Sequence, residues 1–216
     1  MKQWQHILFD LDGTLTDSKK GITRGVQHAL AHFGIEVMDL NALEAYIGPP
    51  LLDSFMELHG MDEGQAREAI LKYREYYTSK GILEHTVYEG IPELLLALKQ
   101  KGRKLYLATS KPTDFAEKII EEDGLTDLFE GIYGSYLDGR RTAKAEVIEA
   151  VLKEHGLLPD HTVMVGDRSH DVIGAKSHGL HFIGVLYGYG TRKELIDSGA
   201  EQVAENVAEL KQFLLD

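Results

Sequence analysis

The chain has 216 residues, of which 43% are hydrophobic and 27% are charged, a composition typical of soluble globular proteins. Its formal net charge of -12 argues against nucleic acid or an anionic membrane as a partner, because both attract basic surfaces. The absence of cysteine excludes disulfides, thiolate metal sites and cysteine nucleophiles. The sequence contains no secretory signal and no apolar run of membrane-spanning length, so we expect a cytoplasmic protein.

The first predicted strand covers residues 7–10 and ends in two carboxylates, those of Asp10 and Asp12. A turn that begins at Asp10 can point both carboxylates at one spot. Because unpaired buried charge is costly, this pair predicts a cation or a reacting group beside it. A calcium-binding loop is excluded, since Thr14 and Leu15 stand where that pattern needs a third acid and a glycine.

A long helical segment follows, from about Asp17 to about Leu83. Glycines and prolines divide it into predicted helices over residues 22–33, 42–47, 51–59 and 63–78. We therefore predict an inserted all-helical cap domain over residues 17–83. Its two linkers lie side by side and would form a hinge, so that the cap can close over the strand ends.

The rest of the chain alternates between strand-like and helical runs. Strands are predicted at 104–110, 131–135, 162–167 and 181–185, and the later helices at 143–155 and 169–178. This alternation is typical of a parallel sheet with helices on both faces. We therefore predict an α/β fold, a three-layer Rossmann-like core built from residues 1–16 and 84–216.

Polar residues follow several of these strands or begin the next helix. They are Asp10 with Asp12, Thr109 with Ser110, Lys144, and Asp167 with Asp171. Ligands of open parallel sheets bind at the carboxyl ends of the strands. We therefore expect these side chains to form one site.

Two motifs carry a family resemblance: Asp-x-Asp-Gly-Thr-Leu over residues 10–15 and Gly-Asp-x-x-x-Asp over residues 166–171. In combination they resemble the haloacid dehalogenase-like phosphohydrolases, and the resemblance covers essentially the whole chain, including the helical cap. Residues 9–18, 47–51 and 186–190 are most similar to the phosphoglycolate-phosphatase and 5′-nucleotidase-like branch. The resemblance implies Mg²⁺-dependent hydrolysis of a small phosphorylated metabolite through an aspartyl-phosphate.

The acidic residues suit these roles. A carboxylate can attack phosphorus, and Asp10 is the candidate nucleophile. Asp12 is placed to protonate the leaving alkoxide and then to take a proton from water. Mg²⁺ prefers oxygen ligands, for which Asp10 and Asp167 are the candidate carboxylates, and the resemblance adds the backbone carbonyl of Asp12. Asp171 lies one helical turn from Asp167, so it can act through water or hold Lys144.

The expected phosphate-binding residues are Asp10, Gly13, Thr109, Ser110 and Lys144. A hydroxyl with its neighbouring backbone and a fixed ammonium group are what a transferring phosphoryl group needs. As an alternative, Ser110 is an ordinary cap for the helix that begins near Pro112. Lys111, next to Ser110, either adds to the positive field of the site or is a surface lysine, and we favour the surface lysine.

Other interpretations of the remaining site residues stay open. In one alternative, Asp167 and Asp171 cap the start of a helix and bind no metal, since acidic residues are favoured there. Lys144 lacks the proline that often follows this lysine in the family, so Arg140 or Arg141 competes with it as the phosphate cation.

Several further features favour plain structural roles. His28 and His32 are four residues apart on a helix but have no evident third metal ligand, which favours a packed or solvated pair. Tyr73, Tyr76 and Tyr77 have helical spacing and favour packing within the cap. The segment 187–190 is predicted to be a loop near the strand ends, and a contact with the substrate stays open as an alternative.

Three competing functions share the fold. A dehalogenase lacks an acid at the position of Asp12, a phosphomutase is discounted only weakly through Thr14, and a silent binding module should have lost one of the three acids Asp10, Asp12 or Asp167.

A nucleoside 5′-monophosphate and phosphoglycolate both fit as substrates, with a slight preference for the former. Candidate specificity residues in the cap are the loop 47–51, Lys19, Lys20 and Arg24. The oligomeric state is not predicted.

Overall fold

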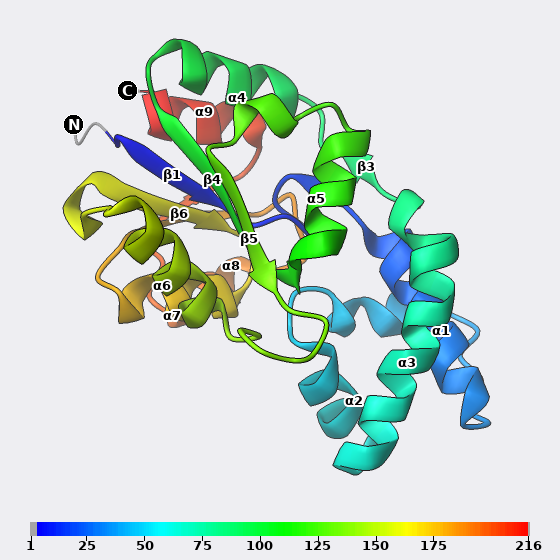
Figure 1. Cartoon of the computed structure of the whole chain (residues 1–216). Coiled ribbons are helices and arrows are strands. Elements are labelled where there is room, and N and C mark those ends of the chain that lie inside the picture. Colours follow the sequence, from blue (N-terminus) through cyan, green and yellow to red (C-terminus); the bar gives the residue numbers. More distant parts are fainter. Residues whose placement is uncertain (1–3, 216) are drawn as a thin grey trace. The chain divides into compact units, whose positions relative to one another are not determined.

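The computed structural model describes residues 4–215 and divides the chain into two compact units. A core unit comprises Met1–Thr16 and Val87–Asp216, and a helical unit comprises Asp17–Thr86 (Figure 1). The chain passes between them through two short strands that pair with each other, β2 (Thr16–Asp17) and β3 (Thr86–Val87).

The core unit is built on a six-stranded sheet in the order β5-β4-β1-β6-β7-β8, and its strand pairs are parallel. The strands are β1 (His6–Phe9), β4 (Lys104–Pro112), β5 (Gly131–Ser135), β6 (Thr162–Gly166), β7 (His181–Val185) and β8 (Gln202–Ala204). The predicted Rossmann-like parallel sheet is therefore confirmed, with β1 at its centre.

Helices cover both faces of this sheet. They are α4 (Ile91–Gln100), α5 (Thr113–Glu122), α6 (Lys144–His155), α7 (Ser169–Ser177), α8 (Arg192–Asp197) and α9 (Val207–Leu215). Short 3₁₀ turns lie at Thr126–Leu128 and Pro159–His161. In Figure 1, α4 and α9 pack together on one face and α6 and α7 on the other. Because both faces are covered, successive residues of β1 such as Leu8 and Phe9 are fully buried.

The helical unit contains α1 (Lys19–His32), η1 (Leu40–Tyr46), α2 (Leu51–His59), α3 (Glu63–Ser79) and η2 (Gly81–Leu83). α1 and α3 pack closely, and the absence of a side chain at Gly25 makes room for this. A Cβ atom at Gly25 would lie 2.7 Å from the ring of Tyr73. Tyr73 and Tyr77 are buried and their rings stack at 5.0 Å. The predicted role of these two tyrosines in packing within the unit is confirmed.

Candidate active site

Asp10 lies directly after β1, between the neighbouring strands β4 and β6. Its backbone N–H donates to the carbonyl of Val165 at 2.9 Å, and the residue is buried. The turn that follows is closed by the carbonyl of Leu11, which accepts hydrogen bonds from the N–H groups of residues 14–16. Gly13 has a φ of +86°, a conformation that favours glycine. This tight turn holds the acidic motif at the carboxyl edge of the sheet.

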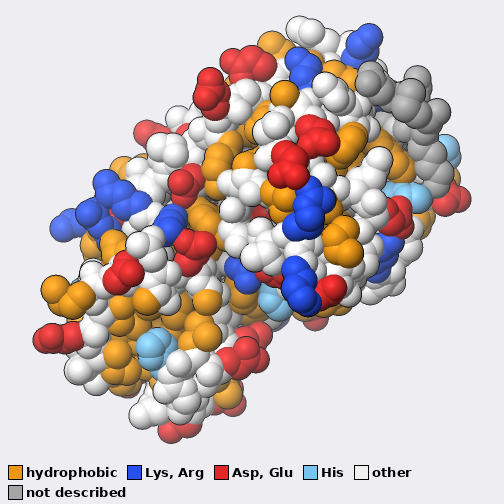
Figure 2. Space-filling model, turned by 180° about the vertical axis from the view of Figure 1, so that it is seen from behind, with side chains coloured by type: hydrophobic (Ala, Val, Ile, Leu, Met, Phe, Trp, Pro, Cys, Tyr) orange, Lys and Arg blue, Asp and Glu red, His pale blue; other side chains and the backbone are white. Residues whose placement is uncertain are grey.

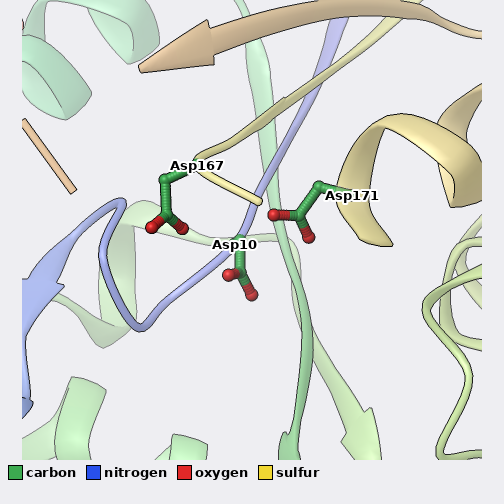
Figure 3. Close-up of side chains that lie close together, drawn as sticks. All are labelled: Asp10, Asp167 and Asp171. Carbon is green, nitrogen blue, oxygen red and sulfur yellow. The ribbon is translucent and has the colours of Figure 1, made fainter. Parts of the chain in front are cut away.

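Three buried carboxylates meet at this edge. Asp167 follows β6 and Asp171 lies in the first turn of α7. One oxygen of each and one of Asp10 all lie within 4.8 Å of one another (Figure 3). Within residues 4–215 this is the only cluster of three or more potential metal-ligating side chains of its kind.

Burial and mutual repulsion raise the pKa values of two of these carboxylates. Burial raises the pKa of Asp10 to about 6, and the negative charge of Asp171 adds to this, although Lys144 acts in the opposite direction. The pKa of Asp167 lies well above its ordinary value because of burial, followed by the charges of Asp171 and Asp10. Hard oxygen donors with excess negative charge are a suitable donor set for Mg²⁺. The residues therefore fit a divalent cation.

Lys144 is the cation that contacts the cluster. It begins α6, and its Nζ lies 2.6 Å from Oδ1 of Asp10 and 2.7 Å from Oδ1 of Asp171. It also donates to the carbonyl of Ala108 at 2.9 Å. Burial works to lower the pKa of this ammonium group, but Asp10 and Asp171 outweigh it and raise the pKa above its usual range. Lys144 therefore stays charged across physiological pH.

The two competing arginines have other partners. Arg140 Nε lies 2.8 Å from Oδ2 of Asp138, and Arg141 Nε donates to the carbonyl of Gly134 at 2.7 Å. Both guanidinium groups lie over the ring of Tyr136, at 4.7 Å and 4.4 Å from its centroid. In this structure the contact with Asp10 is made by Lys144 and by neither arginine.

The interpretation of Lys111 as a surface lysine is wrong. Its side chain is only 5% exposed, and its Nζ lies 2.8 Å from Oδ2 of Asp12. Asp12, which is not one of the three clustered carboxylates, has its own buried cation. The feature of the sequence that could have indicated a site residue is the position of Lys111, which follows Ser110 directly at a strand end.

Thr109 and Ser110 lie near the end of β4, and Thr109 is fully buried whereas Ser110 is partly exposed. The hydroxyl of Thr109 accepts the N–H of Lys111 at 3.2 Å. The carbonyl of Ser110 accepts the hydroxyl of Ser135 at 2.8 Å, which joins the ends of β4 and β5. These bonds fix the backbone on which Ser110 is presented.

Sequence reasoning missed the polar groups around Asp167. Thr14 Oγ1 donates to Oδ1 of Asp167 at 3.4 Å, and the N–H of Tyr189 donates to Oδ2 at 2.8 Å. The feature of the sequence that could have indicated these contacts is the pair of glycines in the segment 187–190, since glycines allow two backbones to approach closely.

In the helical unit, three predicted features have partners within that unit. Lys19 pairs with Glu44, and Arg24 pairs with Glu84. His28 and His32 lie 3.6 Å and 2.9 Å from carboxylates of α3, with both imidazoles partly exposed, as a solvated pair should be.

Charged side chains of both signs are interspersed on the face of the molecule seen in Figure 2. Among the helices of the described residues, none has the length and apolar character needed to cross a membrane.

Comparison with known proteins decides the family. The sequence model described as haloacid dehalogenase-like hydrolase matches residues 7–185, which contain all four aspartates of the two motifs. The chain belongs to the haloacid dehalogenase-like hydrolases. It is a phosphatase of this family, as its relatives and structural neighbours indicate. The predicted family and enzyme class are confirmed.

Among the relatives is a 5'-nucleotidase of Pseudomonas aeruginosa, 49% identical over 98% of this chain and 96% of its own length. The tyrosine-protein kinase PtkA of Mycobacterium tuberculosis is 39% identical over 97% of this chain and 71% of its own. A phosphoglycolate phosphatase of Aliivibrio fischeri is 27% identical over 92% and 91%. The crystal structure of a predicted phosphatase from Clostridium acetobutylicum superposes with a TM-score of 0.97, at 45% identity and 99% coverage of both chains.

Proposed function

We propose that this phosphatase uses Mg²⁺ to hydrolyse a small phosphate monoester, with the phosphoryl group carried transiently on Asp10. The observation that carries the proposal is the buried cluster of Asp10, Asp167 and Asp171, two of which bind the ammonium group of Lys144. A cluster of this charge needs a divalent cation before a phosphate dianion can approach it.

In the first proposed step a carboxylate oxygen of Asp10 attacks phosphorus, and the bond from phosphorus to the leaving oxygen breaks. Asp12 gives its proton to that leaving oxygen. In the second step Asp12, now a carboxylate, takes a proton from a water molecule that attacks phosphorus, and the bond to Asp10 breaks. The products are an alcohol and inorganic phosphate, and both aspartates return to their starting states.

The two aspartates differ in their surroundings, which supports different roles. Asp10 belongs to the carboxylate cluster, whereas Asp12 pairs with Lys111 outside it. A nucleophile benefits from a cation shared with the phosphate, and an acid–base group must reach the leaving oxygen instead. We therefore assign attack to Asp10 and proton transfer to Asp12.

The side chains of Asp10 and Asp167 would hold Mg²⁺, and the backbone carbonyl of Asp12 would join them, as the family resemblance implies. When bound, the ion would supply positive charge between the nucleophile and the phosphate. Asp171 would act through Lys144, in keeping with the 2.7 Å contact between them.

The phosphate would be bound by Lys144 and Ser110, with Thr109 and the backbone of Gly13 beside them. Lys144 is already ordered by two carboxylates and one carbonyl, so little reorganisation is needed when a phosphate arrives. Ser110 offers a hydroxyl from a strand end that is fixed by its bond to Ser135.

We assign the role of a cap to the helical unit, with predicted limits at residues 17 and 83. Support comes from the two paired strands through which the chain enters and leaves this unit. A unit tethered in this way can close over an active site and exclude water.

A nucleoside 5′-monophosphate is the preferred substrate, because the relative named 5'-nucleotidase is 49% identical over nearly the whole chain. Phosphoglycolate is the second candidate and rests on a relative of only 27% identity.

The test is a panel of nucleoside 5′- and 3′-monophosphates, phosphoglycolate and an aryl phosphate, ranked by kcat/KM with Mg²⁺ and with a chelator. We expect 5′-monophosphates to rank first, and turnover to disappear with the chelator and in Asp10→Asn. Asp160→Asn, at an exposed position of the core unit, is the matched control. Turnover that survives chelation or Asp10→Asn overturns the mechanism, and a higher rank for phosphoglycolate overturns the substrate assignment.

A further inference from the structure

We propose that the segment Tyr187–Gly190, together with Thr14, holds the carboxylate of Asp167 in its metal-binding orientation and thereby sets the Mg²⁺ affinity of the site. This inference rests on the proposed function, and it assigns positioning roles to residues that take no part in the chemistry.

Both oxygens of the Asp167 carboxylate accept hydrogen bonds from this arrangement. The backbone N–H of Tyr189 donates to Oδ2 at 2.8 Å, and the hydroxyl of Thr14 donates to Oδ1 at 3.4 Å. Asp167 and Thr14 are fully buried, so water does not compete for these bonds. Two donors on opposite oxygens determine how the plane of the carboxylate is turned.

The donors are themselves fixed. The hydroxyl of Tyr187 donates to the backbone carbonyl of Thr14 at 3.1 Å, which connects the segment to the turn after β1. The ring of Tyr187 packs against that of Tyr88 in an edge-to-face arrangement, with centroids 5.0 Å apart. Thr14, Tyr187 and Tyr189 thus form one connected set of contacts around Asp167.

Two glycines allow the segment to lie against Asp167. A Cβ atom at Gly190 would lie 1.7 Å from the backbone oxygen of Asp167. One at Gly188 would lie 2.2 Å from the carbonyl oxygen of Gly13 and 2.6 Å from Cβ of Asp167. Since real Cβ contacts are not this short, only glycine fits at either position. The backbone of the segment therefore packs directly on the metal-ligand residue and on the catalytic turn.

A ligand that is already oriented loses less freedom when the metal binds, so its partners raise metal affinity without touching the ion. Loss of such a partner typically weakens metal binding by about 10–100-fold. We expect the larger effect for Thr14, which bonds the carboxylate itself, and a smaller one for Tyr187, which acts through Thr14.

The experiment is calorimetric titration of the substrate-free protein with Mg²⁺, accompanied by the Mg²⁺-induced shift in Tm. We expect the Kd for Mg²⁺ to rise about tenfold in Thr14→Val and about threefold in Tyr187→Phe, with Thr14→Ser close to the wild type. Turnover in the valine and phenylalanine variants should recover as Mg²⁺ is raised.

The matched control is Tyr133→Phe, because the buried Tyr133 hydroxyl also bonds a neighbour, His155 Nε2 at 2.8 Å, without contacting the site. It should leave the Kd for Mg²⁺ unchanged. Wild-type affinity in Thr14→Val and Tyr187→Phe, or an equal loss in Tyr133→Phe, overturns the inference. A wild-type protein that binds no Mg²⁺ overturns the proposed function instead.

Discussion

The ammonium group of Lys111 lies 2.8 Å from Oδ2 of Asp12, and the two side chains are only 5% and 9% exposed. Lys111 comes from β4 and Asp12 from the turn after β1, so the pair joins two neighbouring strands at their carboxyl ends. In this buried environment the contact with the ammonium group favours one position of the Asp12 side chain. Lys111 thereby positions the proposed acid–base group.

The first prediction concerns Lys111→Met, which removes this charge while keeping most of the apolar side-chain volume. We expect kcat for an alkyl phosphate to fall about 10–100-fold, because proton transfer by Asp12 becomes inefficient. For an aryl phosphate the initial burst of leaving group should keep its wild-type rate, since that group departs without a proton. The steady rate that follows should fall, because hydrolysis of phosphorylated Asp10 also depends on Asp12. The measurement is kcat for the alkyl phosphate, together with the burst rate and the steady rate for the aryl phosphate, at saturating Mg²⁺.

Lys111→Arg is the conservative companion variant, and it should recover part of the activity toward the alkyl phosphate. A slowed burst with the aryl phosphate in Lys111→Met would contradict the assignment, because it would show that Lys111 acts on phosphate binding and not through Asp12.

The second prediction concerns the stability contributed by Lys144. Lys144→Met leaves Asp10 and Asp171 without the ammonium group that now lies within 2.7 Å of both. We expect the free energy of unfolding to fall by about 3–5 kcal/mol, as when one partner of a buried ion pair is removed. Urea unfolding in the presence of a chelator measures this.

The control for this variant is Lys153→Met in the same helix, where Lys153 pairs with Glu149 on the exposed surface. Its urea midpoint should match that of the wild type. A Lys144→Met protein as stable as the Lys153→Met protein would show that the buried pairing contributes nothing to the fold.

The third prediction is a pH dependence caused by Asp10. Its pKa is raised from 3.8 to about 6 in the folded protein, so between these values the folded state binds more protons than the unfolded state. Stability contributed by the protonated group is therefore present at low pH and lost as the pH rises through about 6. The loss amounts to about 3 kcal/mol for a shift of this size.

The measurement is the free energy of unfolding of the metal-free wild type minus that of Asp10→Asn, from pH 4 to pH 7. We expect this difference to decline between pH 4 and about pH 6 and to level off towards pH 7, because the asparagine cannot ionise. A difference that stays constant with pH would contradict the raised pKa.

The fourth prediction concerns metal removal. Mg²⁺ that binds only the folded state stabilises it by about 2.7 kcal/mol at 100 times its Kd, so Tm should rise with Mg²⁺ and return after chelation. Asp167→Asn should lose most of this rise, whereas Asp160→Asn should keep it. An Asp167→Asn protein with a wild-type response to Mg²⁺ would remove Asp167 from the metal site.

Much of the core was predictable from sequence because its strands are buried on both faces. The strands predicted at 131–135 and 181–185 have the same bounds as β5 and β7. Each is a short segment that contains residues which favour β-strands. β8, at the edge of the sheet, was not predicted, because its three residues are too few to show a pattern. Residues 42–47 were predicted as helical, and most of this stretch lies in the 3₁₀ turn η1 (Leu40–Tyr46), which periodicity does not distinguish from an α-helix.

The candidate site was predictable where its residues stand directly after strands, since parallel strands end at one edge. Lys111 was misjudged because the register of β4 against β5 shifts between Ala108 and Pro112, so alternation no longer tells which side chain points inward. The bonds from Thr14 and Tyr189 to Asp167 join segments far apart in the sequence. No local pattern encodes such contacts, although the glycines at 188 and 190 mark a close approach.

The central claim is that Asp10 carries the phosphoryl group, and acid quenching during turnover of an aryl phosphate by Asp12→Asn tests it most directly. An aryl leaving group needs no proton, so the intermediate should form, and without the acid–base group its hydrolysis should be slow. We predict a peptide containing Asp10 that is heavier by one phosphoryl group and loses it in hydroxylamine, with none in Asp10→Asn. Turnover without any phosphorylated Asp10, or with the group on another residue, would contradict the account.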